Sequence, residues 1–131
     1  MSNARKSAVG NLYRSGYLRS VPWFRRRDQW FTEQEARTYE LRCVVCGRAA
    51  TRRQLELHHL DYTRVTLVGA RWICGEIHED LCAMHPACHG LVHRVLDSDP
   101  VLRGHRTRPV ATVHAIRIAR TRIPAAEQSR T

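Results

Sequence analysis

Two groups of cysteine and histidine residues have the types and spacing that bind metal ions. In the first group, Cys43 and Cys46 are separated by two residues and followed by Gly47, and His85 and Cys88 have the same separation. Each pair can supply two ligands from one tight turn, and four nitrogen and sulfur ligands suit a tetrahedral Zn²⁺. The 38 residues between Cys46 and His85 exceed the spacing in a zinc finger, so they must form a folded insertion.

The fourth ligand of this predicted structural zinc site has two candidates, His85 and Cys82. A pair formed by Cys82 and Cys88 has five intervening residues, which is too many for a tight turn, whereas His85 has the required offset. We favour His85 and expect Cys74 and Cys82 to be small buried residues. The alternative is that all of these cysteines only fill the core.

The second group consists of His58 and His59, which are adjacent, and His89 and His93, which are four residues apart. Histidines four apart share one face of a helix, so His89 and His93 can point at a common atom. Adjacent residues of a strand point in opposite directions, so His58 and His59 cannot easily bind the same ion. One of them can therefore bind a metal while the other stays free to act as a base.

Short strands and helices must position these residues. An aromatic stripe predicts a helix over residues 20–42, capped by Ser20, with four aromatic residues toward the core and Arg25, Arg26 and Arg27 largely outside. Alternation predicts strands over 54–59 and 81–84, and Pro86 opens a helix over 86–96 that ends at 97–100. The four aromatic residues are Trp23, Phe24, Trp30 and Phe31.

The remaining segments predict a hairpin and a last helix. The hairpin pairs 65–68 with 72–73, and the helix covers 109–120 with Val110, Val113 and Ile116 or Arg117 on one face. The 131 residues fit one small α+β domain at 20–120 with its core at 43–97. A flexible basic arm at 1–19, anchored near Tyr17, and a disordered tail at 121–131 would flank it.

The charge predicts a polyanionic partner. The formal net charge is +10, and 21 of the 22 basic residues are arginine, whose planar fork suits phosphate. We expect DNA as the partner, with phosphate contacts from Arg25, Arg26, Arg27, Arg64 and Arg94. Five cysteines without an apolar leader segment predict a reduced cytoplasmic protein, and no apolar run predicts a membrane span.

These motifs resemble the HNH nuclease family, which has the ββα-metal fold, also called the His-Me finger. The similarity extends from about residue 17 to about residue 94 and is densest in CVVCG (43–47), LELHHLDY (55–62) and EDLCAMHPACHGLVH (79–93). Two positions depart from the family pattern. Asp80 stands where the family commonly has Asn, and His85 stands where it commonly has Cys, but both replacements keep the required chemistry.

The resemblance implies a role for each residue of the second group. His58 takes the place of the metal ligand on the first strand, and His59 that of the general base. His89 is similar to the helix metal ligand, and His93 to a further ligand or a contact to the scissile phosphate. Asp80 would orient His59 or hold the loop.

The implied function is a metal-dependent DNA endonuclease, with a structural Zn²⁺ and one catalytic Mg²⁺, Mn²⁺, Ni²⁺ or Zn²⁺. An alternative from another class is a zinc-stapled DNA-binding module that does not cut. RNA as the substrate is a third possibility. A protein partner could supply target specificity, because the sequence contains no identifiable base-reading helix.

Overall fold

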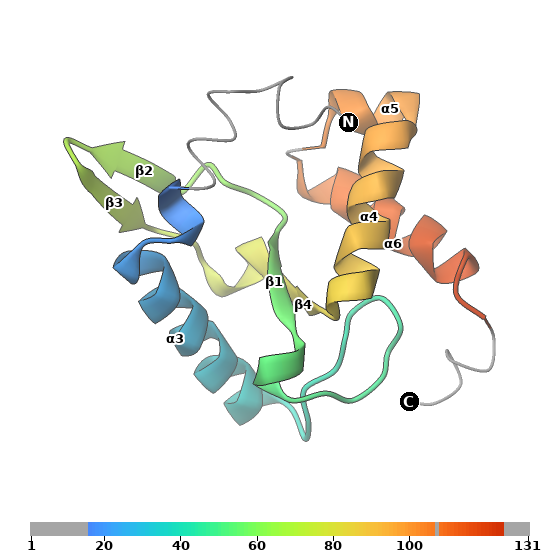
Figure 1. The fold of residues 1–131 in the computed structure, drawn as a ribbon, viewed down its shortest axis with the longest axis horizontal. Coiled ribbons are helices and arrows are strands. Elements are labelled where there is room, and N and C mark those ends of the chain that lie inside the picture. Colours follow the sequence, from blue (N-terminus) through green and yellow to red (C-terminus); the bar gives the residue numbers. More distant parts are fainter. Residues whose placement is uncertain (1–15, 107, 125–131) are drawn as a thin grey trace.

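The protein folds into a small α+β structure with two antiparallel two-stranded sheets and helices around them (Figure 1). The computed structural model describes residues 16–106 and 108–124. No helix in these two ranges is long and apolar enough to cross a lipid bilayer. In chain order, the elements are α3 (Val21–Arg37), β1 (Glu56–His59), β2 (Val65–Val68), β3 (Arg71–Cys74), β4 (Leu81–Met84), α4 (Pro86–Ser98), α5 (Pro100–Gly104) and α6 (Pro109–Thr121).

The central sheet consists of β1 and β4 and lies between α3 on one side and α4 with α6 on the other (Figure 1). Its register pairs His58 with Cys82 and His59 with Leu81. Because successive side chains of a strand point to opposite faces, His58 faces α4 and His59 faces α3. Both predicted strands are confirmed, although β1 begins only at Glu56 because residues 52–54 form a 3₁₀ turn.

Helix α3 covers the side of the sheet that carries His59. Ser20 caps its start by accepting a hydrogen bond from Trp23 N at 3.3 Å. The predicted aromatic face is confirmed for Trp23, Trp30 and Phe31, which are at most 5% exposed, but Phe24 is 52% exposed and faces solvent. Three of the four aromatic residues therefore anchor the helix to the core.

Helix α3 ends at Arg37, earlier than the pattern of residues 20–42 predicts. Thr38 adopts an extended conformation, with φ −127° and ψ 158°, and its N–H still bonds to Gln34 O. Tyr39 is fully exposed, whereas Leu41 is buried. The chain must leave the helix here because Leu41 and the cysteine pair that follows have to turn back into the core.

The hairpin predicted after β1 is confirmed as β2 and β3, which pair antiparallel from Val65 with Cys74 to Val68 with Arg71. Gly69 has a φ of +62° at the turn, a conformation that glycine adopts without steric cost. The hairpin extends away from the central sheet next to the start of α3 (Figure 1). After β3, residues 75 and 76 bring the chain back toward His59.

Helix α6 packs along α4 through a strip of small residues. Of the residues that the pattern places on one face, Ile116 is buried, but Val110 and Val113 are 64% and 42% exposed. Small side chains allow two helix backbones to approach closely, which the larger valines would prevent. The buried residues of α6 are Ala111, Thr112, Ala115, Ile116 and Ala119.

The folded domain extends beyond both predicted ends. Tyr17 is 0% exposed and belongs to the core, and Ile123 packs against the core after α6. The rest of the predicted arm (1–15) and most of the predicted tail (125–131) lie outside the described residues. Residues 97–100 do not simply end α4: α4 continues to Ser98, and Asp99 caps α5, which the sequence pattern does not predict.

We predict that Ala115→Leu destabilises the protein. Ala115 is 0% exposed, and overfilling a packed contact costs about 1–3 kcal/mol in free energy of unfolding. Val113→Leu on the same helix is the control, and its cost should stay below about 0.5 kcal/mol because Val113 is partly exposed. Urea unfolding measures both. Equal losses in the two variants would contradict the packing of α6 on α4.

Candidate functional site

Four residues form a cluster that could hold a structural zinc ion: Cys43, Cys46, His85 and Cys88. One potential ligand atom from each residue lies within 4.8 Å of those from the other three. The first two residues lie in the loop after Leu41, whereas His85 is the N-cap of α4 and Cys88 lies in its first turn. Three thiolates and one imidazole are a suitable donor set for tetrahedral zinc.

The backbone of the cysteine loop supports this cluster. Gly47 N donates to Cys43 O at 2.9 Å, and the φ of Gly47 is +78°, which favours glycine at this turn. Val44 N donates to Ala83 O at 2.9 Å and joins the loop to β4. His85 N points at Cys43 Sγ at 3.4 Å. The loop and the start of α4 are thus held together by main-chain groups.

The structure brings His85, and not Cys82, to the cysteine cluster. Cys82 lies on β4, and its burial raises the pKa of its thiol to about 12, so it stays protonated. Burial, and then repulsion by Cys43 and Cys46, raise the pKa of Cys88 to about 12 as well. A cation such as Zn²⁺ would allow the gathered thiols to ionise together.

A second cluster contains His58, His89 and His93. His58 Nδ1 lies 3.2 Å from His89 Nε2, and His93 Nε2 lies 3.1 Å from the same His89 nitrogen. Two ligands bound to one ion at roughly 2.0–2.1 Å in neighbouring positions lie about 3.0–3.4 Å apart. The spacing of these nitrogens therefore fits a single transition-metal ion.

The outer partners of His89 and His93 determine which ring nitrogens carry protons. Glu56 Oε1 accepts a hydrogen bond from His89 Nδ1 at 2.9 Å, so His89 Nε2 keeps a lone pair for a cation. Arg106 Nη2 donates to His93 Nδ1 at 3.2 Å, so in a neutral ring His93 Nε2 carries the proton. Of its two predicted roles, a donor to phosphate therefore suits His93 better than a metal ligand.

His58 is suited to binding a metal. It is 4% exposed. Its burial, and then the proximity of His93 and His89, lower its pKa well below the ordinary value, so the ring stays neutral. Its Nε2 lies 3.1 Å from the hydroxyl of Thr112 on α6, and its Nδ1 points toward His89. Strand β1 and helices α4 and α6 thus meet at the ring of His58.

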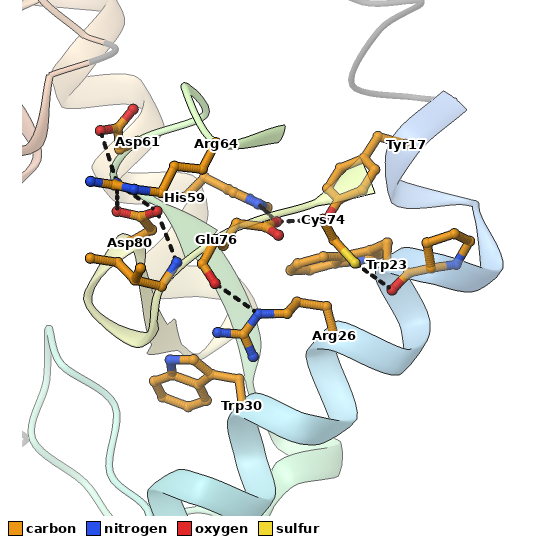
Figure 2. Close-up of polar contacts among 12 residues, drawn as sticks. Tyr17, Trp23, Arg26, Trp30, His59, Asp61, Arg64, Cys74, Glu76 and Asp80 are labelled. Atoms are coloured by element: carbon orange, nitrogen blue, oxygen red, sulfur yellow. Dashed lines mark hydrogen bonds and ion pairs between the residues drawn. The ribbon is translucent and has the colours of Figure 1, made fainter. Parts of the chain in front are cut away.

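On the opposite face of β1, His59 forms a buried pair with Glu76 (Figure 2). His59 Nε2 lies 2.7 Å from Glu76 Oε2, and the two side chains are 1% and 0% exposed. The hydroxyl of Tyr17 donates to the same carboxylate oxygen at 2.6 Å. The imidazole ring stacks on Tyr62 with 4.0 Å between centroids. With Nε2 held by the carboxylate, Nδ1 is the nitrogen that could accept a proton.

The charges of this buried pair are consistent with its hydrogen bonds. Burial opposes ionisation of Glu76, but hydrogen bonds from His59 and Tyr17 outweigh it and lower the pKa of the carboxyl. Burial, and then the interaction with Glu76, raise the pKa of Tyr17, so its hydroxyl stays protonated and can donate. Glu76 is therefore a buried carboxylate with two donors on one oxygen.

Close backbone contacts deliver Glu76 to His59. Gly75 N donates to Arg64 O at 2.9 Å, and a Cβ at position 75 would lie only 2.6 Å from that oxygen. Only glycine fits this approach without a backbone shift. On the other side, Arg26 Nε donates to Glu76 O at 3.1 Å (Figure 2). The contact between Gly75 and Arg64 and the contact from Arg26 on α3 together fix the position of the Glu76 carboxylate.

Asp80, predicted to orient His59 or to hold the loop, contacts the loop. Its two carboxylate oxygens accept from Arg64 Nη1 at 2.7 and 2.9 Å, and Oδ2 also accepts from Ile77 N at 3.2 Å (Figure 2). The partner of His59 is Glu76. The side chain of Asp80 therefore fixes the loop that carries Glu76, and its main-chain carbonyl accepts from Leu60 N, next to His59, at 2.8 Å.

The structure corrects part of the predicted phosphate-binding set. Arg26 is 7% exposed and bonds to the main chain of Glu76, and Arg27 donates to Leu55 O at 3.1 Å. Arg26 therefore lies inside the fold and does not belong to an outer basic face, whereas Arg27 is half-buried and its guanidinium is held by main-chain carbonyls. Arg64 is paired with Asp80. Arg25 and Arg94 are exposed.

Four hydrogen-bond partners of these histidines were not predicted from the sequence: Glu56, Glu76, Arg106 and Thr112. Glu76 follows Gly75 in a connection without periodicity, so no pattern marks it. Thr112 did carry a signal, because it is a polar residue within the strip of alanines on one face of α6. Glu56 is the exposed residue of β1, where alternation alone suggests solvent.

Comparisons of the chain with models of known protein families, with curated proteins and with solved structures find no match.

We predict that Cys46→Ser abolishes zinc binding, because it removes one of four ligands, whereas Cys82→Ser retains it. Elemental analysis of the purified variants gives the zinc content per chain. The two substitutions are chemically identical, so they separate the metal ligand from a half-buried thiol. Full zinc content in Cys46→Ser, or its loss in Cys82→Ser, would contradict the assigned ligand set.

We also predict that Glu76→Ala lowers the free energy of unfolding by about 3–5 kcal/mol, because it leaves Tyr17 and His59 without a buried acceptor. Glu79→Ala is the control. Glu79 is 71% exposed in its ion pair with Arg37, and its loss should cost less than about 0.5–1 kcal/mol. Urea unfolding of both zinc-loaded variants tests this difference, and similar values would refute it.

Proposed function

We propose that this protein is a metal-dependent DNA endonuclease of the HNH type, in which β1, β4 and α4 form a ββα-metal core. The observation that carries the proposal is the convergence of His58, His89 and His93 at spacings of 3.1 and 3.2 Å, with a further histidine on the opposite face of the same strand. This arrangement assigns metal binding and proton acceptance to different residues, and hydrolysis of a phosphodiester uses both.

His58 Nδ1 and His89 Nε2 would hold the catalytic ion. Their imidazole donors favour Mn²⁺, Ni²⁺ or Zn²⁺ over Mg²⁺. When bound, the ion supplies positive charge for a phosphate oxygen and for the leaving 3′ oxygen. Glu56 supports this role, since it fixes the proton of His89 on the nitrogen that faces away from the ion.

His59 would act as the general base. The Glu76 carboxylate accepts a hydrogen bond from Nε2 and so keeps the ring proton there, which leaves the lone pair of Nδ1 for the attacking water. Nδ1 would take one proton from this water as its oxygen attacks phosphorus and the bond to the 3′ oxygen breaks. The leaving oxygen gains a proton from solvent, so the products carry 5′-phosphate and 3′-hydroxyl ends. Glu76 stabilises the imidazolium that forms.

His93 would contact the scissile phosphate. The donation from Arg106 to Nδ1 leaves Nε2–H of His93 as a donor toward the cluster, where a phosphate oxygen could accept it. The net charge of +10 favours binding of DNA along the rest of the surface, including exposed Arg25 and Arg94. Positioning and electrostatic stabilisation would thus come from different residues than proton removal.

A second function competes with cleavage, and one observation favours it. His59 has a side chain that is 1% exposed, whereas a base must meet a water molecule next to the substrate. A zinc-stapled module that binds DNA without cutting it would tolerate such burial. Under the nuclease proposal, the loop at Tyr62 has to move when DNA binds, because Tyr62 stacks on the ring of His59.

We predict that the zinc-loaded protein converts supercoiled plasmid to nicked or linear DNA only when Mg²⁺, Mn²⁺, Ni²⁺ or additional Zn²⁺ is supplied. His59→Ala should reduce the rate on the order of a hundredfold or more, because general base catalysis contributes at least that much. His114→Ala is the control: it removes an exposed histidine of α6, and its rate should equal that of the wild type.

Each outcome of this assay decides between the two functions. Cleavage without an added divalent ion, or an unchanged rate in His59→Ala, would refute the proposed mechanism. Retarded migration of a DNA duplex on a native gel without cleavage under any of the four ions would favour the binding module.

A further inference from the structure

Helix α6 contributes a buried hydroxyl to the histidine cluster. Thr112 is 0% exposed, and its Oγ1 lies 3.1 Å from His58 Nε2, although the two residues are 54 positions apart. The segment that resembles the nuclease family ends near residue 94, so this contact comes from outside it. Thr112 is also the one polar member of the buried strip of α6.

The chemistry of a hydroxyl suits both states of His58. When His58 Nδ1 binds a cation, the ring proton must lie on Nε2, and Thr112 Oγ1 can accept it. When no cation is bound, the hydroxyl can turn and donate to His58 Nε2, and the ring proton then lies on Nδ1. Because both residues are buried, water cannot easily replace this partner.

The position of Thr112 is fixed at both ends of α6. Around it, the alanines of the helix pack on α4. Near the C-terminal end, Arg120 donates from Nη2 to Val44 O at 2.6 Å and from Nε to Val45 O at 3.2 Å. These two carbonyl groups belong to the cysteine loop of the zinc cluster. One helix therefore contacts both candidate metal sites.

We propose that Thr112 is a positioning residue for the histidine metal site: its hydroxyl holds His58 in the tautomer that presents Nδ1 to a divalent ion. This inference rests on the metal site of the proposed function, but it concerns metal affinity and does not require DNA cleavage. A hydrogen bond from a metal-bound imidazole is stronger than one from a free imidazole, since the cation polarises the N–H group. Loss of the hydroxyl therefore weakens the metal-bound state more than the metal-free state.

The test is isothermal titration of Ni²⁺ into untagged, zinc-loaded protein, with His58→Ala to identify the heat that belongs to the histidine site. Thr112→Val keeps the volume but removes the hydroxyl, and it should weaken Ni²⁺ binding about 10–100-fold. Thr112→Ser keeps the hydroxyl and should bind within a few-fold of the wild type. Thr121→Val, which removes an exposed hydroxyl of the same helix, is the control and should leave affinity unchanged.

Three outcomes would overturn the inference: wild-type affinity in Thr112→Val, equal weakening in the Val and Ser variants, or no Ni²⁺ binding at the histidine site of the wild type. Zinc content and urea unfolding of each variant exclude a general loss of structure as the cause. If the wild type binds Ni²⁺ and Thr112→Val weakens it, while no ion supports plasmid cleavage, the nuclease proposal fails and the role of Thr112 stands.

Discussion

The alternation of side chains along β1 is the constraint on which the two candidate groups of the site depend. A single peptide unit separates His58 from His59, yet one ring meets α4 and α6 while the other meets α3 and Glu76. Any shift of β1 by one residue against β4 would exchange these environments. The register of four residue pairs thus determines which imidazole lies beside the other two histidines and which lies beside a carboxylate.

The two faces are stabilised by different means. The face of His58 gathers three imidazoles whose outer nitrogens bond to groups from β1, α6 and the chain after α5. The face of His59 buries a carboxylate, which is unfavourable by itself but is offset by donors from Tyr17 and His59. Removal of one buried partner should therefore affect stability at the His59 face and metal binding at the His58 face.

Residue spacing predicts the parts of the site that are local in sequence. The paired ligands of the zinc cluster, the strands at 54–59 and 81–84 and the i, i+4 pair on α4 all follow from short patterns, and the structure brings the same residues together. Glu76 and Thr112 could not be predicted in this way. Their partners lie 17 and 54 residues away, and only tertiary packing joins them.

The prediction for the arginines fails for the same reason, because tertiary packing decides which of them is buried. Three consecutive arginines suggest a solvated basic face, but helical geometry turns Arg26 inward, where a main-chain carbonyl accepts from it. On α6, the spacing of Val110, Val113 and Ile116 indicates a helix, but only Ile116 of these three is buried, beside Ala111, Ala115 and Ala119. Spacing therefore identifies the helix, whereas its packing on α4 decides which side chains are buried.

The contact between α6 and the cysteine loop also has a consequence for the order in which the protein can assemble during synthesis. Arg120 and Val44 are 76 residues apart, and β1, β4 and α4 leave the ribosome before α6 does. The histidine cluster can gather early from local elements, but His58 gains its buried partner only when α6 docks. During synthesis, this site can therefore be completed only after α6 has emerged, later than the elements that supply all three histidines.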